Sequence, residues 1–305
     1  MSTFRKAEAF IYRCARPLEV VRWRYHFENG PREDVLRVLS YYQNEDGGFG
    51  HGIEADNWNP ASSPISTLDG IIVLNEIGMK DGSHPIIRGL LRYLDSGADF
   101  DAEHNQWWGS VPSNNDHPHA YWWGYDGKDA FQYNPTAGLT AFILRFAEPG
   151  SGLYKKGETI AREAVQWYLE KETFQEEHVA ANFIGLYEAM KEKGLSLCDM
   201  DAFLEKLRSQ VRLSICTDAE KWDKEYTARP SHFGITPESP FYEEFAELCL
   251  AECEFYRKKQ LQDGSYPVTW KWWNDYPEFE AAKIRWQGVI TLLNMRFMKA
   301  HGQVD

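Results

Sequence analysis

The sequence predicts an all-α protein, a somewhat irregular α/α toroid in which inner and outer helices alternate. Three observations predict this fold: apolar residues recur at helical spacing along most of the 305 residues, one turn motif occurs near each end, and short and long connections alternate. No stretch longer than a few residues alternates in the manner of a strand, so strands should be minor. Residues 1–305 are expected to form a single domain, because no linker rich in Gly, Pro or Ser divides them.

Apolar periodicity and terminal signals place the helices. Pro85 and Pro135 lie near helix starts, where a missing N–H is tolerated. Gly78, Gly97 and Gly194 follow apolar patterns as C-terminal stops. The expected helices cover about 6–27, 32–43, 65–79, 84–97, 135–147, 154–172, 178–193, 199–216, 240–261 and 280–299.

The connections between these helices differ regularly in length. Short connections cover 79–84, 148–154, 173–177 and 193–199, and long ones cover 44–64, 98–134, 217–239 and 262–279. Antiparallel neighbours place alternate connections at the same end, so the long loops should share one rim. Function is expected at that rim, because binding residues concentrate on elaborated loops. The segment 217–239 is rich in Pro and should replace an inner helix with extended chain.

A Gln-x-x-Asp-Gly-x-aromatic turn occurs at Gln43–Phe49 and again at Gln260–Tyr266. Each copy ends one helical stretch and precedes another, which is typical of a repeat architecture. The turn resembles the Gln-x-x-x-Gly-x-Trp motif of the terpenoid cyclase and protein prenyltransferase superfamily, with Phe and Tyr in place of Trp. The resemblance implies an α/α toroid in which the Gln ends an outer helix and the turn leads inward. Gln106–Gly109 and Phe174–Gln175 keep only parts of the motif.

Composition limits the partners. The net charge of −13 argues against nucleic acid or an anionic membrane surface. No apolar run approaches ~18 residues, so no transmembrane segment is expected. Five scattered cysteines favour a reduced, cytoplasmic setting. Many of the 12 Trp lie in predicted loops, where they either line a cleft for a small-molecule ligand or pack the loops onto the helices.

The segment after the first turn supplies the candidate catalytic residues His51, Glu54 and Asp56. Glu54-Ala-Asp56-Asn57 resembles the Asp-x-Asp-Asp motif of class II terpene cyclases, which implies Asp56 as the proton donor and Glu54 as the neighbour that keeps it protonated. Protonation of an alkene requires an acid held neutral by an apolar wall or a nearby carboxylate. The structural alternative is that these side chains cap a helix and accept N–H groups of the turn.

A divalent metal is a weaker interpretation of the same loops. His51 and Glu54 are three positions apart, and His117-Pro-His119 offers two more ring nitrogens. The zinc ligands Asp, Cys and His that the prenyltransferase resemblance implies have no match, since Cys198-Asp199 has the wrong order. No cofactor and no metal ligand are therefore predicted.

The loop after the second turn indicates sugar chemistry. Trp270, Trp273, Glu278 and Glu280 combine aromatic faces with carboxylates, a combination typical of glycoside hydrolases and of sugar binders. α/α toroids also host polysaccharide lyases and glycoside hydrolases, so the fold does not decide the function. The structural alternative is that acids at a helix start are favoured by the helix dipole.

Function is therefore predicted as a set of hypotheses. The primary one is a terpene-cyclase- or prenyltransferase-like enzyme that acts on an isoprenoid or other apolar ligand in a Trp-lined cavity. The alternatives are a carbohydrate-active enzyme or sugar binder, and a non-catalytic ligand-binding protein. Arg285 is expected to pair with an acid such as Glu54, Asp56 or Asp69, because an unpaired charge in a cavity is costly. The candidate ligand-binding residues are Trp58, Trp108, Trp123, Tyr133, His232, Trp270, Trp273, Glu280, Arg285 and Trp286.

Overall fold

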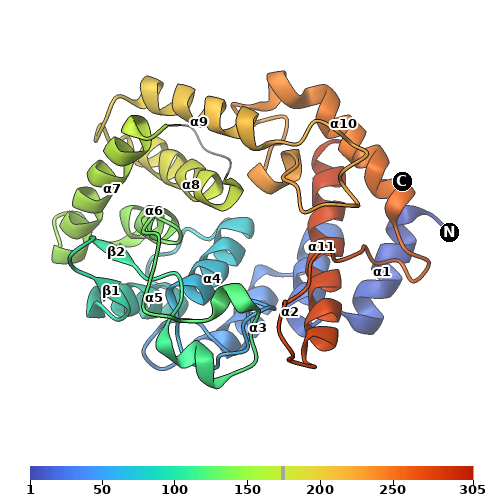
Figure 1. Cartoon of the computed structure of the whole chain (residues 1–305), viewed down its shortest axis with the longest axis horizontal. Coiled ribbons are helices and arrows are strands. Elements are labelled where there is room, and N and C mark those ends of the chain that lie inside the picture. The colour runs from blue at the N-terminus through green and yellow to red at the C-terminus, as the bar shows by residue number, and fades with distance from the viewer. Residues whose placement is uncertain (173–175, 305) are drawn as a thin grey trace. The chain divides into compact units, whose positions relative to one another are not determined.

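The computed structural model describes residues 1–172 and 176–304, and helices dominate it (Figure 1). The all-α prediction is confirmed. The chain separates into two compact units: unit 1 is Met1–Val38 with Ser214–Asp305, and unit 2 is Leu39–Leu213. The predictions of a single domain and of a toroid stay predictions. The partial motif at Phe174–Gln175 lies outside the described residues.

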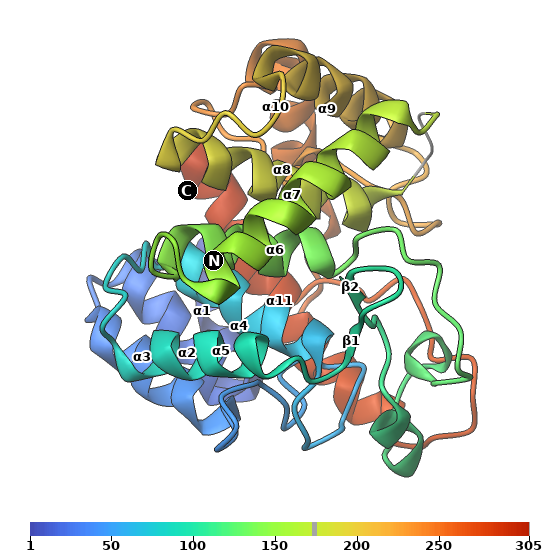
Figure 2. The ribbon, with the colours of Figure 1, turned by 90° about the vertical axis from the view of Figure 1, so that its left-hand side faces the viewer.

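Unit 2 contains two sets of helices. Its helices are α4 (Pro64–Glu76), α5 (Pro85–Ser96), α6 (Thr136–Phe146), α7 (Gly152–Glu170), α8 (Glu177–Lys193) and α9 (Met200–Ser214). Helix α6 packs against α4 and α8, and α5 and α7 pack on α6 (Figure 2). Helices α4 and α6 are apolar nearly all round and mostly buried, whereas α5 is strongly amphipathic. A helix that is apolar all round is buried, whereas an amphipathic helix buries one face.

The long loops of unit 2 carry its minor elements. These are the 3₁₀ helices η1 (Ser40–Tyr42), η2 (Pro112–Asp116) and η3 (Tyr121–Trp123) and the strands β1 (Phe100–Asp101) and β2 (Gln106–Trp107). The two strands pair antiparallel, with Phe100 opposite Trp107 and Asp101 opposite Gln106. In the described part of the chain they are the only strands that pair as a sheet, as predicted.

Unit 1 unites both terminal segments around its last helix. Its elements are α1 (Thr3–Cys14), α2 (Pro17–Phe27), α3 (Arg32–Leu39), η4 (Pro230–Phe233), α10 (Tyr242–Lys259) and α11 (Phe279–Ala300). Helix α11 packs against α1, α2 and α10. From 217 to 239, all of it described, η4 is the only helical element, which agrees with the prediction of extended chain.

The prediction of one helix over 6–27 is wrong. The chain breaks between α1 and α2, where Ala15 and Arg16 are extended with ψ of 158° and 157°. Pro17 then begins α2. A residue that precedes proline is driven out of the helical region by contact with the proline ring. The break follows from this steric rule.

The two Gln-x-x-Asp-Gly turns have the same geometry. The Gln43 amide donates to the carbonyls of Gly47 and Ile86, each at 3.0 Å, so the turn is bound to the start of α5. The Gln260 amide donates to the carbonyls of Gly264 at 3.0 Å and Thr3 at 2.9 Å, which binds the second turn to the start of α1. One motif thus attaches a turn to a neighbouring helix in each unit.

The glycine of each turn is required by close backbone packing. Gly47 has φ of 99° and Gly264 has φ of 98°, a region that L side chains rarely adopt. A Cβ on Gly47 would lie 2.0 Å from the carbonyl oxygen of Gly89, and one on Gly264 would lie 2.0 Å from that of Lys6. The following aromatic residue, Phe49 in one copy, is buried in the core.

A search of the helices in residues 1–172 and 176–304 finds none that combines the length and the apolar character needed to cross a membrane.

Candidate functional site

The two units divide the predicted site residues. Unit 2 holds His51, Glu54, Asp56, Trp58, Trp108, Trp123 and Tyr133, and unit 1 holds His232, Trp270, Trp273, Glu280, Arg285 and Trp286. Each group is therefore described within its own unit. The pairing predicted for Arg285 with an acid of unit 2 stays a prediction.

The three candidate catalytic residues have different environments. His51, at φ of 56°, is exposed, and its Nε2 lies 2.8 Å from the side-chain oxygen of Asn44 in the first turn. Glu54 and Asp56 are 9% and 2% exposed. Two carboxylates are thus buried two positions apart, while the imidazole belongs to the surface of the turn.

Asparagines join the acidic segment to the other long loop of unit 2. Asn57 donates to the side-chain oxygen of Asn114 at 3.2 Å, and Asn59 donates to the same oxygen at 2.9 Å and to Ser113 at 2.8 Å. The backbone of Asp56 accepts from the N–H of Ala120 at 2.8 Å. These buried amides are paired, as buried polar groups must be. They hold two long loops of the unit together.

Sequence reasoning did not single out Asn59 and Asn114. The sequence feature that indicates their role is the recurrence of Asn at 57, 59 and 114. Amide side chains both donate and accept hydrogen bonds, so they can bridge two loops. The contacts support the structural interpretation of this segment, in which its polar side chains fix a turn.

His119 is oriented by the backbone. Its Nδ1 lies 2.6 Å from the carbonyl oxygen of His117. A carbonyl only accepts, so Nδ1 carries the proton and Nε2 of a neutral ring is left as an acceptor. Within the described ranges, no group of three or more His, Cys, Asp or Glu residues is placed to hold a metal ion.

The aromatic candidates of unit 2 contact other residues of the same unit, in loops or on helices. The Trp58 indole donates to the carbonyl of Ala55 at 2.9 Å. Tyr133 is buried beside Trp167 and Phe183, with centroids 5.4 and 6.0 Å away. The remaining two are also engaged by loop residues: Trp108 contacts Tyr125 and Phe131 edge-on, and the carbonyl of Trp123 accepts from Asn114.

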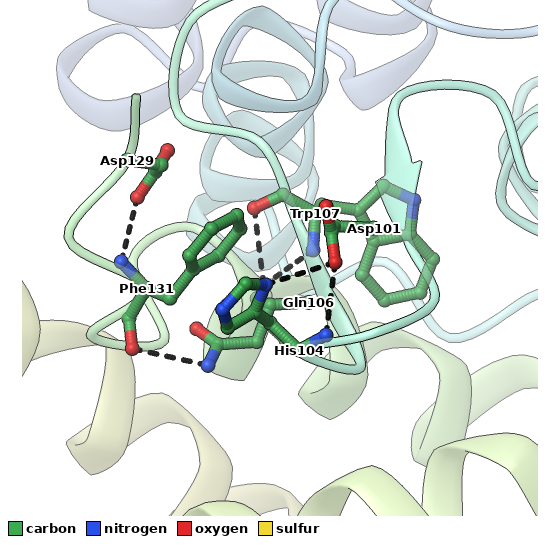
Figure 3. Close-up of polar contacts among 7 residues, drawn as sticks. Asp101, His104, Gln106, Trp107, Asp129 and Phe131 are labelled. Atoms are coloured by element: carbon green, nitrogen blue, oxygen red, sulfur yellow. Dashed lines mark hydrogen bonds and ion pairs between the residues drawn. The ribbon is translucent and has the colours of Figure 1, made fainter. Parts of the chain in front are cut away.

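The side chain of Gln106, in the partial motif, joins β2 to the loop at 131–133 by two hydrogen bonds (Figure 3). The Gln106 amide donates to the carbonyl of Phe131 at 3.0 Å, and its oxygen accepts from the N–H of Tyr133 at 2.7 Å. His104 stacks on Phe131 with centroids 3.9 Å apart. Asp101 accepts from the backbone N–H of His104 at 2.9 Å and lies 3.0 Å from its ring. The backbone hydrogen bond, more than the ring, lowers the pKa of Asp101.

Unit 1 has a hollow at the entry to α11, which we call the Trp273 hollow. Its volume is about 220 Å³, and it is lined by Lys271, Trp272, Trp273, Asn274, Tyr276, Pro277, Phe279 and Glu280. Trp273 is 74% exposed and has φ of 58°. A bulky side chain at positive φ is an outlier that marks strain or function. Trp272, by contrast, is buried against Tyr276 and Phe279.

Two predicted residues, Trp273 and Glu280, therefore meet at one hollow. Trp270 lies beside it in sequence and packs between Trp286 and Tyr226, with centroids 5.1 and 6.0 Å away. His232 lies on η4 and Arg285 on α11.

A second hollow lies in unit 2 and contains none of the predicted residues. It has a volume of about 380 Å³ and is lined by Arg162, Gln166, Leu169, Glu170, Leu197 and Cys198. Arg162 already donates to the carbonyl of Leu197 at 3.2 Å, and Gln166 donates to Glu170 at 2.9 Å. The lining polar groups are thus partly satisfied by one another.

The sequence did not indicate one further polar cluster of unit 1, which surrounds the buried carboxylate of Glu252. Glu252 is fully buried on α10 and accepts from the N–H of Ser231 at 3.0 Å, from its hydroxyl at 2.6 Å, and from Tyr256. The Arg229 guanidinium lies 3.3 Å from it. Burial, and secondarily the Glu252 charge, raise the pKa of Tyr256 well above its usual value. The cluster attaches η4 to α10.

Comparison with protein-family models found no match. Comparisons with curated proteins and with solved structures found no significant match either.

Proposed function

We propose that the helices form an α/α toroid of the kind found in terpenoid cyclases and protein prenyltransferases. Two features support this proposal. In unit 2, the apolar helices α4 and α6 and the amphipathic α5 differ as inner and outer helices should. In unit 1, the second turn docks on the first helix through Gln260, which is how a ring of helices would close. A crystal structure without a closed ring of inner helices would contradict it.

We propose that the Trp273 hollow binds a saccharide. The observation that carries this proposal is Trp273 itself, a largely exposed indole kept at positive φ beside polar groups. An exposed indole beside polar groups offers a flat apolar face on which a ligand ring can stack. A sugar ring has an apolar face that can stack on the indole. Its hydroxyls can bond to Lys271, Asn274 and Glu280, which line the same hollow.

The size of the hollow fits one ring. Sites for drug-sized ligands measure roughly 300–1,000 Å³, and the Trp273 hollow measures about 220 Å³. An isoprenoid chain would need a longer and more apolar cavity than these residues line. The enzyme alternative would use Glu280, the one carboxylate among the lining residues, although glycoside cleavage typically uses two.

The test is a glycan array followed by titration of the hits, read by intrinsic Trp fluorescence. Replacing Trp273 by Ala should weaken binding by roughly two- to tenfold, since ring stacking contributes about 0.5–1.5 kcal/mol. Trp122→Ala is the matched control, because Trp122 is an exposed Trp in unit 2. Absence of binding by the unaltered protein, or equal binding by Trp273→Ala, would overturn the proposal. Cleavage of a bound glycan would separate an enzyme from a binder.

A second candidate function is acid catalysis on an isoprenoid. It is favoured by the burial of Glu54 and Asp56, two carboxylates that lie two positions apart in one segment of unit 2. In this proposal Asp56 donates the proton to an alkene, and Glu54 is the neighbouring carboxylate that keeps Asp56 protonated beforehand. Asp56→Asn should abolish conversion of every accepted prenyl substrate, and Asp116→Asn, at an exposed position, should leave it intact. Turnover that survives Asp56→Asn would exclude this mechanism.

A further inference from the structure

A second exposed aromatic residue of the same unit, Tyr226, lies near the segment that carries Trp273. Trp270 lies three residues before Trp273, where the chain bends. Three residues span at most about 11 Å, so the two indoles attach to the backbone within that distance of each other. The Trp270 ring meets Tyr226 at 6.0 Å, and Tyr226 is 54% exposed. Tyr226 thus offers an exposed aromatic ring in contact with the segment that leads to Trp273.

Trp270 is fixed between two other rings. It meets Trp286 of α11 at 5.1 Å and 83°, and Tyr226 at 86°. Both contacts are edge-to-face, the favourable geometry for aromatic pairs. Such packing orients Trp270 and ties the Tyr226 ring to the segment that carries Trp273.

The loop that carries Tyr226 is held at several points. The N–H of Cys216 donates to the carbonyl of Ala228 at 2.9 Å, which closes the loop at its base. The indole of Trp222 donates to the carbonyl of Cys216 at 2.8 Å. Asp223 pairs with Lys259 of α10 at 2.5 Å. Tyr226 is therefore presented at a defined place, as an ordered ligand platform must be.

We propose that Tyr226 forms a second saccharide subsite, so that the ligand is an oligosaccharide or polysaccharide chain and not a free monosaccharide. This inference rests on the proposed saccharide binding at the Trp273 hollow. One ring occupies the hollow and stacks on Trp273, and a later ring of the same chain stacks on Tyr226. The exposed Lys271, between Trp270 and Trp273 in sequence, can donate to hydroxyls along the path.

The experiment compares each monosaccharide with its own tetramer: glucose with maltotetraose, N-acetylglucosamine with chitotetraose, xylose with xylotetraose. Affinities are measured by calorimetry for the unaltered protein, Tyr226→Ala, Tyr226→Phe and Trp273→Ala. The matched control is Tyr121→Ala, which removes a 65% exposed tyrosine of unit 2.

We expect one tetramer to bind at least tenfold more tightly than its monomer. Tyr226→Ala should remove about that advantage and leave the monomer affinity unchanged, whereas Tyr226→Phe, which keeps the ring, should retain it. Trp273→Ala should weaken both ligands. A monomer that binds as tightly as its tetramer, or a tetramer affinity insensitive to Tyr226→Ala, would overturn the second subsite but not the first. Absence of binding by any monomer or tetramer would instead overturn the proposed function.

Discussion

The side-chain amide of Gln260 donates a 2.9 Å hydrogen bond to the carbonyl oxygen of Thr3, although 257 positions separate the two residues. Gln43 makes the equivalent bond to Ile86 in the other unit. Both acceptors lie in the first turn of a helix, and both Gln residues also bind the glycine carbonyl of their own turn. The repeat in sequence is thus a repeat in hydrogen bonding, and its second copy joins the turn after α10 to the start of α1.

Gln260→Glu should destabilise unit 1. A carboxylate cannot donate, so the bonds to Thr3 and Gly264 would both be lost, at a cost of roughly 1–3 kcal/mol. Urea unfolding measures the loss, and faster amide hydrogen exchange in α1 would locate it. Gln262→Glu makes the same charge change at an exposed position of the same turn and should cost less than about 0.5 kcal/mol. Equal losses for both variants would contradict the role of the bond.

Gly264→Ala and Gly47→Ala should each destabilise the fold by roughly 2–4 kcal/mol, which combines backbone strain with a steric clash. At 2.0 Å from a helix carbonyl, the added Cβ requires the turn and the helix to separate. Gly150→Ala isolates the strain alone, because Gly150 has φ of 86° and open space around its Cβ. Thermal unfolding that ranked Gly150→Ala as the most harmful of the three would refute this explanation.

The helices could be predicted from the sequence because periodicity and caps are local. Apolar spacing and Pro85 are sufficient to place α5, and the Gly194 stop ends α8. The break before Pro17 was missed because the apolar pattern continues through it, although the rule that produces it is also local.

The candidate site was harder to predict from the sequence than the helices. The burial of a side chain and its hydrogen-bond partners depend on residues that are distant in the sequence. His51 is close to Glu54 in sequence, yet its ring bonds to Asn44 at the surface of the turn. Glu252 gave no local signal, because its partners come from a segment 21 or more positions away on one side and from Tyr256 on the next turn of α10. The place of Trp273 in a polar loop is a local feature, and its exposure is one of the two outcomes that such a Trp allows.

Glu252→Ala should cost about 3–5 kcal/mol, the range for removing one partner of a buried ion pair. The change leaves the Arg229 guanidinium without its nearest carboxylate and frees the Ser231 N–H and hydroxyl. Chemical denaturation measures the loss. Glu254→Ala, two positions along α10, removes an exposed partner of Arg257 and should cost less than about 1 kcal/mol. A loss below 1 kcal/mol for Glu252→Ala would show that the cluster is not needed for stability.

Two aspartates near β1 should affect stability in opposite directions as the pH changes. Burial raises the pKa of Asp99 above its ordinary value of 3.8, and the hydrogen bond from Tyr93 opposes the shift only in part. The hydrogen bonds from His104, the backbone one first, lower the pKa of Asp101 below the same ordinary value. The folded state therefore holds a proton on Asp99 more tightly than the unfolded chain does, and holds one on Asp101 less tightly.

The contribution of Asp99 is greatest below pH 3.8 and is lost as the pH rises through the raised pKa, whereas that of Asp101 is present above pH 3.8 and is lost as the pH falls through the lowered pKa. Asp99→Asn should therefore raise the Tm at pH 7, because the amide still accepts from Tyr93 and tolerates the positive φ of 54°. Asp101→Asn should lower the Tm at pH 7, because the charge-assisted bonds from His104 are weakened. Both differences should shrink when the scan is repeated at pH 3. Shifts of the same sign at pH 7 would show that burial and hydrogen bonding do not act on these carboxylates as described.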